Sequence, residues 1–163
     1  MVGIALKLKP EFVCLVPENR MEITTEGGLN VLASFDKTRM VIARLQDAGI
    51  RVSVFIDPDL KQVEAAGEAC ADMIELHTGA FANATGDAVQ VELDRLTAAA
   101  KEGHLSLQVN AGHGINYTNI RQILTIPHLA ELNIGHSIIA RSTRIGLTAA
   151  VKEMKELMAA YNA

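Results

Sequence analysis

The chain has 163 residues, of which 49% are apolar and 21% charged, and its formal net charge is −4 at pH 7. A chain of this size buries a sizeable core, and we expect a single domain over residues 1–163. The 15 Lys and Arg residues are scattered rather than clustered, so the sequence predicts neither a nucleic-acid surface nor a basic patch for membranes.

Short runs rich in Val, Ile, Leu and Phe recur along the chain and are the expected strands. They cover residues 12–16, 51–56, 72–77, 105–110 and 131–138. Each run is almost continuously apolar, which is typical of strands in a parallel sheet that is buried on both faces. Parallel strands need crossover connections, so the intervals between the runs should be helical.

The intervals have helical periodicity. Apolar residues recur on one side of residues 36–48, which end at Gly49, and Asp57-Pro58-Asp59 is a typical start for a second helix. Further helices are predicted over residues 87–101, 119–125 and 143–161. Repeated β-α units are compatible with either a doubly wound open sheet or a β/α barrel.

Polar residues and glycines directly follow the expected strands, and this favours the barrel. Examples are Thr78-Gly79, Gly112-His113-Gly114 and Gly135-His136. In a barrel these strand ends meet at one mouth, where barrel active sites lie. The longest irregular stretch, residues 18–34, contains Thr24 and two glycines. It is expected to be either a loop that covers substrate or a plain surface loop.

Two consecutive strands are followed by a Gly-His pair, at Gly112-His113 and Gly135-His136. Glycines at such ends leave backbone N–H groups close to a ligand, and the loops after the last two barrel strands commonly bind phosphate. Residues 136–141 are expected to start a short helix whose N-terminus faces the anion.

The histidines differ in what their positions predict. His113 lies between two glycines and is suited to proton exchange with a substrate, although it is alternatively a ring that hydrogen-bonds a loop carbonyl. His136 either contacts phosphate or caps the short helix, and His77 either bounds the pocket or is satisfied by neighbours. His104 and His128 lie in connections and are assigned no role.

No metal is expected, because no His or carboxylate set has ligand spacing. No Schiff base formed by the protein is expected, because no lysine ends a strand, and no cofactor is predicted. Asp57 and Glu18 are expected to be a helix cap and a loop charge. Cys14 and Cys70 lie in apolar runs and are predicted to be core thiols of a reducing compartment. Without an apolar run of about 18 residues or a signal-like start, a cytoplasmic protein is expected.

Six segments, in order along the chain, resemble pyridoxine 5'-phosphate synthase. They are Val13-Cys14-Leu15-Val16-Pro17-Glu18, Glu22-Ile23-Thr24-Thr25-Glu26-Gly27-Gly28-Leu29, Phe55-Ile56-Asp57, Ile74-Glu75-Leu76-His77-Thr78-Gly79, Asn110-Ala111-Gly112-His113-Gly114 and Glu131-Leu132-Asn133-Ile134-Gly135-His136. The resemblance covers essentially the whole chain. It implies a TIM-type (β/α)8 barrel, of which this chain supplies about five β-α units.

The resemblance also implies an activity and a site. The family condenses 3-amino-2-oxopropyl phosphate with 1-deoxy-D-xylulose 5-phosphate to give pyridoxine 5'-phosphate, inorganic phosphate and water. By this resemblance His113 is the proton donor, Gly114, Gly135 and His136 bind the amino-ketone phosphate, and Thr24 contacts the deoxyxylulose phosphate. Small phosphorylated substrates, no cofactor and assembly into a homo-oligomer are implied as well.

The front of the chain departs from the family pattern. An eight-stranded barrel needs about three more β-α units than this chain supplies, and by the resemblance they carry further catalytic and sugar-phosphate groups. We therefore expect either a shortened family member or a chain that assembles to cover its sheet edges, with no measurable activity alone. The alternatives are a noncatalytic phosphate-binding fragment and another phosphosugar barrel, such as an isomerase or aldolase. The missing strand-end lysine and the six motifs disfavour the latter.

Overall fold

The computed structural model describes residues 1–17, 27–159 and 161. One parallel sheet runs in chain order through β1 (Phe12–Leu15), β2 (Arg51–Ile56), β3 (Met73–His77), β4 (Gln108–Gly112) and β5 (Leu129–Asn133). The helices are α1 (Val2–Leu8), α2 (Phe35–Gln46), α3 (Leu60–Glu68), α4 (Gly79–Asn83), α5 (Ala88–Gly103), α6 (Ile120–Ile123), α7 (His136–Ile145) and α8 (Leu147–Met158), with a 3-10 turn at Leu32–Ser34. The predicted β-α alternation with parallel strands is confirmed.

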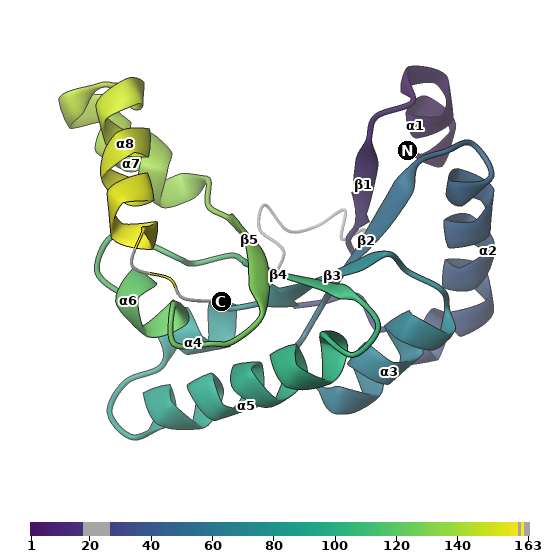
Figure 1. Ribbon diagram of the computed structural model, residues 1–163, viewed down its shortest axis with the longest axis horizontal. Helices are drawn as coiled ribbons and strands as arrows, with labels where there is room; N and C mark the ends of the chain where they lie inside the picture. Colours follow the sequence, from purple (N-terminus) through teal and green to yellow (C-terminus); the bar gives the residue numbers. More distant parts are fainter. Residues whose placement is uncertain (18–26, 160, 162–163) are drawn as a thin grey trace.

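One face of the sheet packs against helices. Figure 1 shows α2, α3 and α5 along this side of the strands. Alternate strand residues such as Val52, Val54, Ile56, Ile74 and Leu76 are completely buried there. Because side chains alternate along a strand, the intervening residues point to the other face.

The other face carries polar groups. Cys14 lies opposite Ser53 in the register, Phe55 opposite Glu75, and Glu75 opposite Asn110, so these side chains share one side of the sheet. Ser53 and Asn110 are buried. In a β/α barrel the helices form an outer ring around the strands, so the aliphatic face that packs against the helices corresponds to the outside of a barrel and the mixed face to its inside.

Several element boundaries differ from the prediction. The fifth strand is Leu129–Asn133 instead of 131–138, because the chain turns at Ile134 and Gly135 into helix α7. The long helix expected over 143–161 is interrupted at Gly146, whose φ of 83° and ψ of 153° are not helical, and α8 begins after it. Helices α1 and α4 were not predicted.

The surface corrects one expectation about the cysteines. Cys14 is half-buried on the polar face of the sheet, but Cys70 is exposed in the turn after α3 and is not a core thiol.

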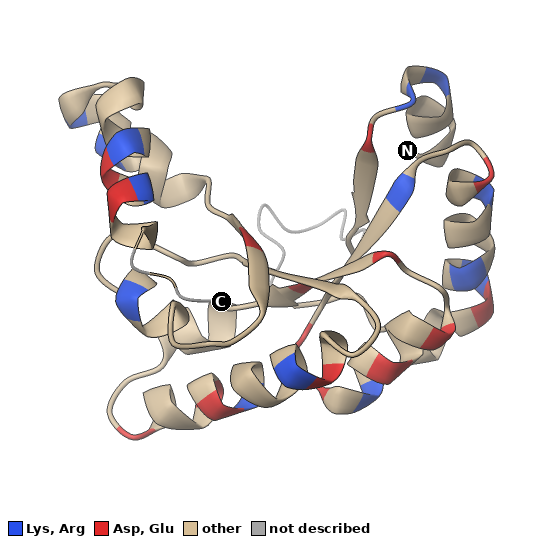
Figure 2. Cartoon of the chain, viewed as in Figure 1, with Lys and Arg blue, Asp and Glu red and all other residues tan. Residues whose placement is uncertain are grey.

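Figure 2 shows Lys, Arg, Asp and Glu interspersed along the helices. In the part of the chain that the structure describes, no helix is long and apolar enough to cross a membrane.

Candidate functional site

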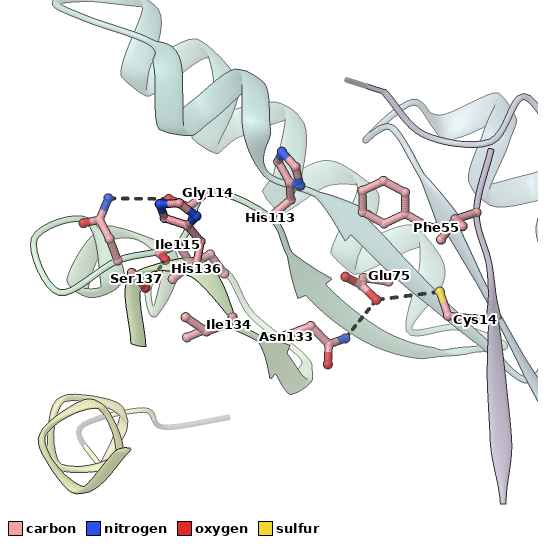
Figure 3. A pocket seen from close by; sticks show the side chains of 13 residues that line it. Cys14, Phe55, Glu75, His113, Gly114, Ile115, Asn133, Ile134, His136 and Ser137 are labelled. Carbon is pink, nitrogen blue, oxygen red and sulfur yellow. Dashed lines mark hydrogen bonds between the residues drawn. The ribbon is translucent and has the colours of Figure 1, made fainter. Parts of the chain in front are cut away.

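A cavity of about 570 Å³ opens where the carboxyl ends of the strands meet (Figure 3). Its walls come from all five strands or the loops that follow them, and its lining residues are Cys14, Val16, Phe55, Glu75, His113, Gly114, Ile115, Asn116, Asn133, Ile134, Gly135, His136 and Ser137. The structure thus brings together four of the residues singled out in the sequence, namely His113, Gly114, Gly135 and His136. The fifth, Thr24, lies outside the described residues.

The backbone at His113 and Gly114 adopts an unusual conformation. Both residues are left-handed, with φ of 78° and 79°, which is costly for a residue with a side chain such as His113. The buried hydroxyl of Thr78, just after β3, donates to the carbonyl of Gly112 at 2.9 Å and also reaches the carbonyl of His113. The end of β3 therefore holds the strained turn that presents His113.

The ring of His113 stands beside two other rings at the edge of the cavity. Its centroid lies 4.8 Å from that of His77 and 6.4 Å from that of Phe55. Partial burial lowers the pKa of His113, and positive charge on His77 lowers it further. The protonated ring is therefore a stronger acid than an ordinary histidine.

Glu75 is a site residue for which the sequence analysis assigned no role. Its Oε2 accepts a hydrogen bond from Asn133 Nδ2 at 2.8 Å and from the thiol of Cys14 at 3.7 Å (Figure 3). Burial raises the pKa of Glu75 above its ordinary value, and the two hydrogen bonds offset only part of that effect. A carboxylate inside the otherwise apolar run of β3 was the signal that could have found it.

Gly112 leaves room for the Glu75 carboxyl, and the thiol of Cys14 donates a hydrogen bond to it. A Cβ at Gly112 would overlap Glu75 Oε1, so glycine there allows the carboxyl to approach β4. Burial, with a smaller effect of the Glu75 charge, raises the pKa of Cys14 to about 12. The Cys14 thiol therefore stays protonated near neutral pH and acts as a hydrogen-bond donor.

Helix α7 begins at the cavity wall. Gly135 is its N-cap and His136 its first residue, so the side chain of His136 does not occupy the capping position that was one alternative for it. No side chain caps this helix end within the described residues. The hydroxyl of Ser137 donates to the carbonyl of Ile115 at 2.8 Å and fixes the helix start against the loop after β4. The N–H groups of the first turn are consequently available to a ligand.

A second cavity of about 610 Å³ adjoins the first at His113. It is lined by Asp57, Pro58, His77, Gly79, Ala80, Asn83, Arg95 and His113. Asp57 was expected to cap α3, but Asp59 caps that helix instead. The side chain of Asp59 accepts hydrogen bonds from the N–H groups of Lys61 and Gln62. Instead, Asp57 Oδ1 lies 3.0 Å from His77 Nδ1 and accepts from the N–H of Gly28, also at 3.0 Å.

Among residues 1–17, 27–159 and 161, no three His, Cys, Asp or Glu side chains are grouped so that they could hold a metal ion. The polar groups that line the cavity include His113, Glu75 and His136, and the backbone at the start of α7 forms part of its wall.

Comparison with known proteins agrees with these features. Residues 1–160 match the family described as "Pyridoxal phosphate biosynthesis protein PdxJ". A pyridoxine 5'-phosphate synthase of Akkermansia muciniphila is 53% identical over 158 residues, which are 96% of this chain and 64% of the relative. Proteins of the same name from Opitutus terrae and Magnetococcus marinus are 54% and 51% identical over 161 and 160 residues, in each case 97% of this chain and 65% and 66% of the relative.

The chain thus spans just under two thirds of the length of these curated relatives. The family match extends over nearly all of the chain, and the resemblance found in the six motifs is confirmed. The chain belongs to the family of pyridoxal phosphate biosynthesis proteins PdxJ.

Proposed function

We propose that this chain supplies the proton donor and a phosphate-binding end of a pyridoxine 5'-phosphate synthase site. The reaction joins 3-amino-2-oxopropyl phosphate to 1-deoxy-D-xylulose 5-phosphate and releases inorganic phosphate and water. The observation that carries the proposal is the convergence of His113, Glu75 and the start of α7 on one cavity. The names of the three curated relatives support it.

The start of α7 is the proposed phosphate site. The helix has ten residues, and the partial positive charge at its N-terminus attracts an anion while its first N–H groups donate hydrogen bonds. Gly135 leaves this approach open, since a Cβ there would meet no other atom within 4 Å. Gly114 and His136 line the same cavity and are proposed to contact the amino-ketone phosphate. The proposed role of Thr24 toward the other substrate is independent of these contacts.

His113 and Glu75 are the proposed acid–base groups. Their environments move the two pKa values toward each other, because burial lowers that of the imidazolium and raises that of the carboxyl. Glu75 therefore keeps its proton to a higher pH than a free carboxyl, and protonated His113 gives up its proton more readily than a free imidazolium, which suits a ring closure with several proton transfers. We assign His113 as proton donor and Glu75 as a group that stabilises positive charge or accepts a proton.

A chimera tests the catalytic part of the proposal. In it, this chain replaces the matched segment of the Akkermansia muciniphila relative. We expect the chimera to form pyridoxine 5'-phosphate from both substrates, and His113→Asn to lower its kcat by about 10²–10⁴-fold. His104→Asn is the matched control, because His104 stacks on His128 away from both cavities. An inactive chimera that is correctly folded would disprove the proposed function, and full turnover by His113→Asn would disprove the role of His113.

Phosphate binding is tested on the 163-residue chain itself. We expect inorganic phosphate to shift the amide NMR signals of His136 and Ser137 at the start of α7. The amides of Leu147 and Thr148 at the start of α8 are the internal control, since that helix also follows a glycine but lies outside the cavity. Equal shifts at both helix starts would show that the anion does not select this site.

We also propose the cytoplasm as the compartment and a homo-oligomer as the assembly, as the sequence resemblance implies. Cys14 and Cys70 are both free thiols, which fits a reducing compartment. Light scattering of the purified chain measures the assembly directly, and a monomeric mass across the working concentration range would contradict it.

A further inference from the structure

His77 is the most buried titratable side chain near the site. It is the last residue of β3, its side chain is 7% exposed, and its Nδ1 lies 3.0 Å from Asp57 Oδ1. A carboxylate oxygen accepts hydrogen bonds, so the proton of the neutral His77 ring is on Nδ1. The other ring nitrogen, Nε2, is then the unprotonated one.

Nε2 of His77 is buried and has no hydrogen-bond partner within the described residues. It lies against Gly79, where an added Cβ would overlap it, and the same Cβ would come within 3.1 Å of His113 Cδ2. Buried nitrogens without partners are rare in folded proteins and call for an explanation. In this case the unpaired nitrogen is directed at the place where the two histidines meet.

The ring of His77 also forms the wall on which His113 rests. The two rings meet edge to face at 67°, with centroids 4.8 Å apart, and Phe55 packs against both. The residue after His77 is Thr78, whose hydroxyl holds the backbone carbonyl of His113. The end of β3 therefore positions both the ring and the backbone of His113.

We propose that His77, held by Asp57, is a positioning residue that sets the orientation and the protonation of His113. The inference rests on the proposed function for its link to turnover, because it assumes that His113 transfers a proton to substrate. Its structural part, the coupling of two neighbouring imidazoles, is independent of any activity. His77 itself is not proposed to touch substrate, because its Nε2 is buried in the structure.

Charge explains how the coupling acts. Two imidazolium rings at this separation repel each other, so protonation of one disfavours protonation of the other. The lowered pKa of His113, caused first by burial and then by His77, agrees with this. The other titratable or charged groups that line the two cavities with His113 are Cys14 on β1, Asp57 after β2, Glu75 on β3, Arg95 on α5 and His136 on α7.

The test is an NMR titration of histidine ring signals in the full 163-residue chain and in His77→Phe. Phenylalanine keeps a ring against His113 and so retains most of its burial, but it cannot carry a charge. We expect the pKa of His113 to rise in His77→Phe and to stay unchanged in His104→Phe, a matched substitution away from both cavities. An unchanged pKa of His113 in folded His77→Phe would overturn the proposal.

The reciprocal variant keeps the test decisive if His77→Phe does not fold. His113 is exposed, so His113→Asn should fold, and because coupling between two sites is reciprocal, this substitution should change how the ring signals of His77 respond to pH. A His77 titration that is the same with and without His113 would overturn the coupling.

Kinetics in the chimera test the link to turnover. His77→Phe should lower kcat and leave KM nearly unchanged, since a positioning residue acts through His113 and not on bound substrate. A raised KM with unchanged kcat would instead place His77 in contact with substrate. If the unsubstituted chimera is inactive, the proposed function fails, while the NMR titration still decides whether the two histidines are coupled.

Discussion

Glycine has two separate reasons to occupy position 114. Its φ of 79° is left-handed, and an added Cβ would lie 2.5 Å from the Cβ of Ala82 in α4. Gly49 has nearly the same φ, 78°, but a Cβ added at Gly49 would meet no other atom within 4 Å. The two positions therefore separate the conformational cost of a side chain from the cost of a steric clash.

We predict that Gly49→Ala lowers the free energy of unfolding by about 1–2 kcal/mol, the cost of a left-handed residue. Gly114→Ala should lower it by about 1–3 kcal/mol more, because Ala82 must also move. Urea denaturation of both variants measures the difference. Equal losses of unfolding free energy would show that the close approach to Ala82 adds no cost.

Glu75 should give the protein a measurable pH dependence of stability. Burial raises its pKa in the folded chain, so between the ordinary glutamate value of about 4.3 and the raised value the folded state keeps a proton that the unfolded chain has lost. The unfolding free energy contributed by this group therefore falls as pH rises through that window. Glu75→Gln cannot titrate and should remove this fall.

The measurement for Glu75 is the unfolding free energy from pH 4 to pH 8, compared between the unsubstituted chain and Glu75→Gln. Their difference should move in favour of Glu75→Gln as the pH increases. Glu64→Gln on the exposed side of α3 is the matched control and should show no such trend. A constant difference across the range would mean that Glu75 titrates normally.

Residue identity alone located part of the site. His113, Gly114, Gly135 and His136 were found because glycine next to histidine after a strand is distinctive. Glu75 was missed because its exposure to the cavity depends on which face of β3 it occupies, and the pairing register with β2 and β4 determines that. Asp57 was misjudged for a similar reason, since its partner His77 is distant in sequence and adjacent only in the sheet.

At the level of elements, Tyr161 connects the chain after α8 to the start of β5. Its hydroxyl accepts from the N–H of Leu129 at 2.7 Å and donates to the carbonyl of Ile126 at 3.1 Å. Tyr161→Phe removes the hydroxyl and so leaves the N–H of Leu129 and the carbonyl of Ile126 without this partner. We therefore predict that the unfolding free energy falls by about 1–3 kcal/mol.

The control for Tyr161→Phe is Tyr117→Phe. Among the described residues, the hydroxyl of Tyr117 makes one hydrogen bond, which it donates to the carbonyl of Ala150 at 2.8 Å. Tyr117→Phe should lower the unfolding free energy by less than Tyr161→Phe does. Thermal and urea unfolding of both variants give the comparison. If Tyr161→Phe is as stable as the unsubstituted chain, the segment after α8 does not hold β5.

Element boundaries were harder to predict than element order. Apolar periodicity continues from α7 into α8, and only the backbone angles of Gly146 separate the two helices. Helix α4 has five residues, too few to show a period. The apolar residues of 131–138 looked like a strand, yet Ile134 and Ile138 pack against the core from a turn and a helix.

On the scale of the whole molecule, the five strands form an open part of a β/α barrel with β1 and β5 at the edges of the described sheet. Alternation of strands and helices predicted this order, because consecutive parallel strands joined by helices are usually neighbours. The β-α alternation by itself left a barrel and an open sheet as alternatives, and the polar residues and glycines after the strands favoured the barrel. The polar inner face, centred on Glu75 and Asn110, is the feature that relates this sheet to a barrel interior.

The isolated chain and the chimera should differ in turnover. Within the described residues, the first cavity holds two histidines and one glutamate, and ring formation from two phosphorylated substrates needs several positioned acids and bases. The chain aligns with only 64–66% of the length of its relatives, and the chimera supplies the rest of the relative's chain. Because each positioned acid or base contributes about 10²–10⁴ in rate, we expect no measurable turnover by the 163-residue chain and clear turnover by the chimera. Product formation from both substrates, assayed at equal protein concentration, measures both. Comparable rates would mean that His113, Glu75 and His136 suffice for the chemistry.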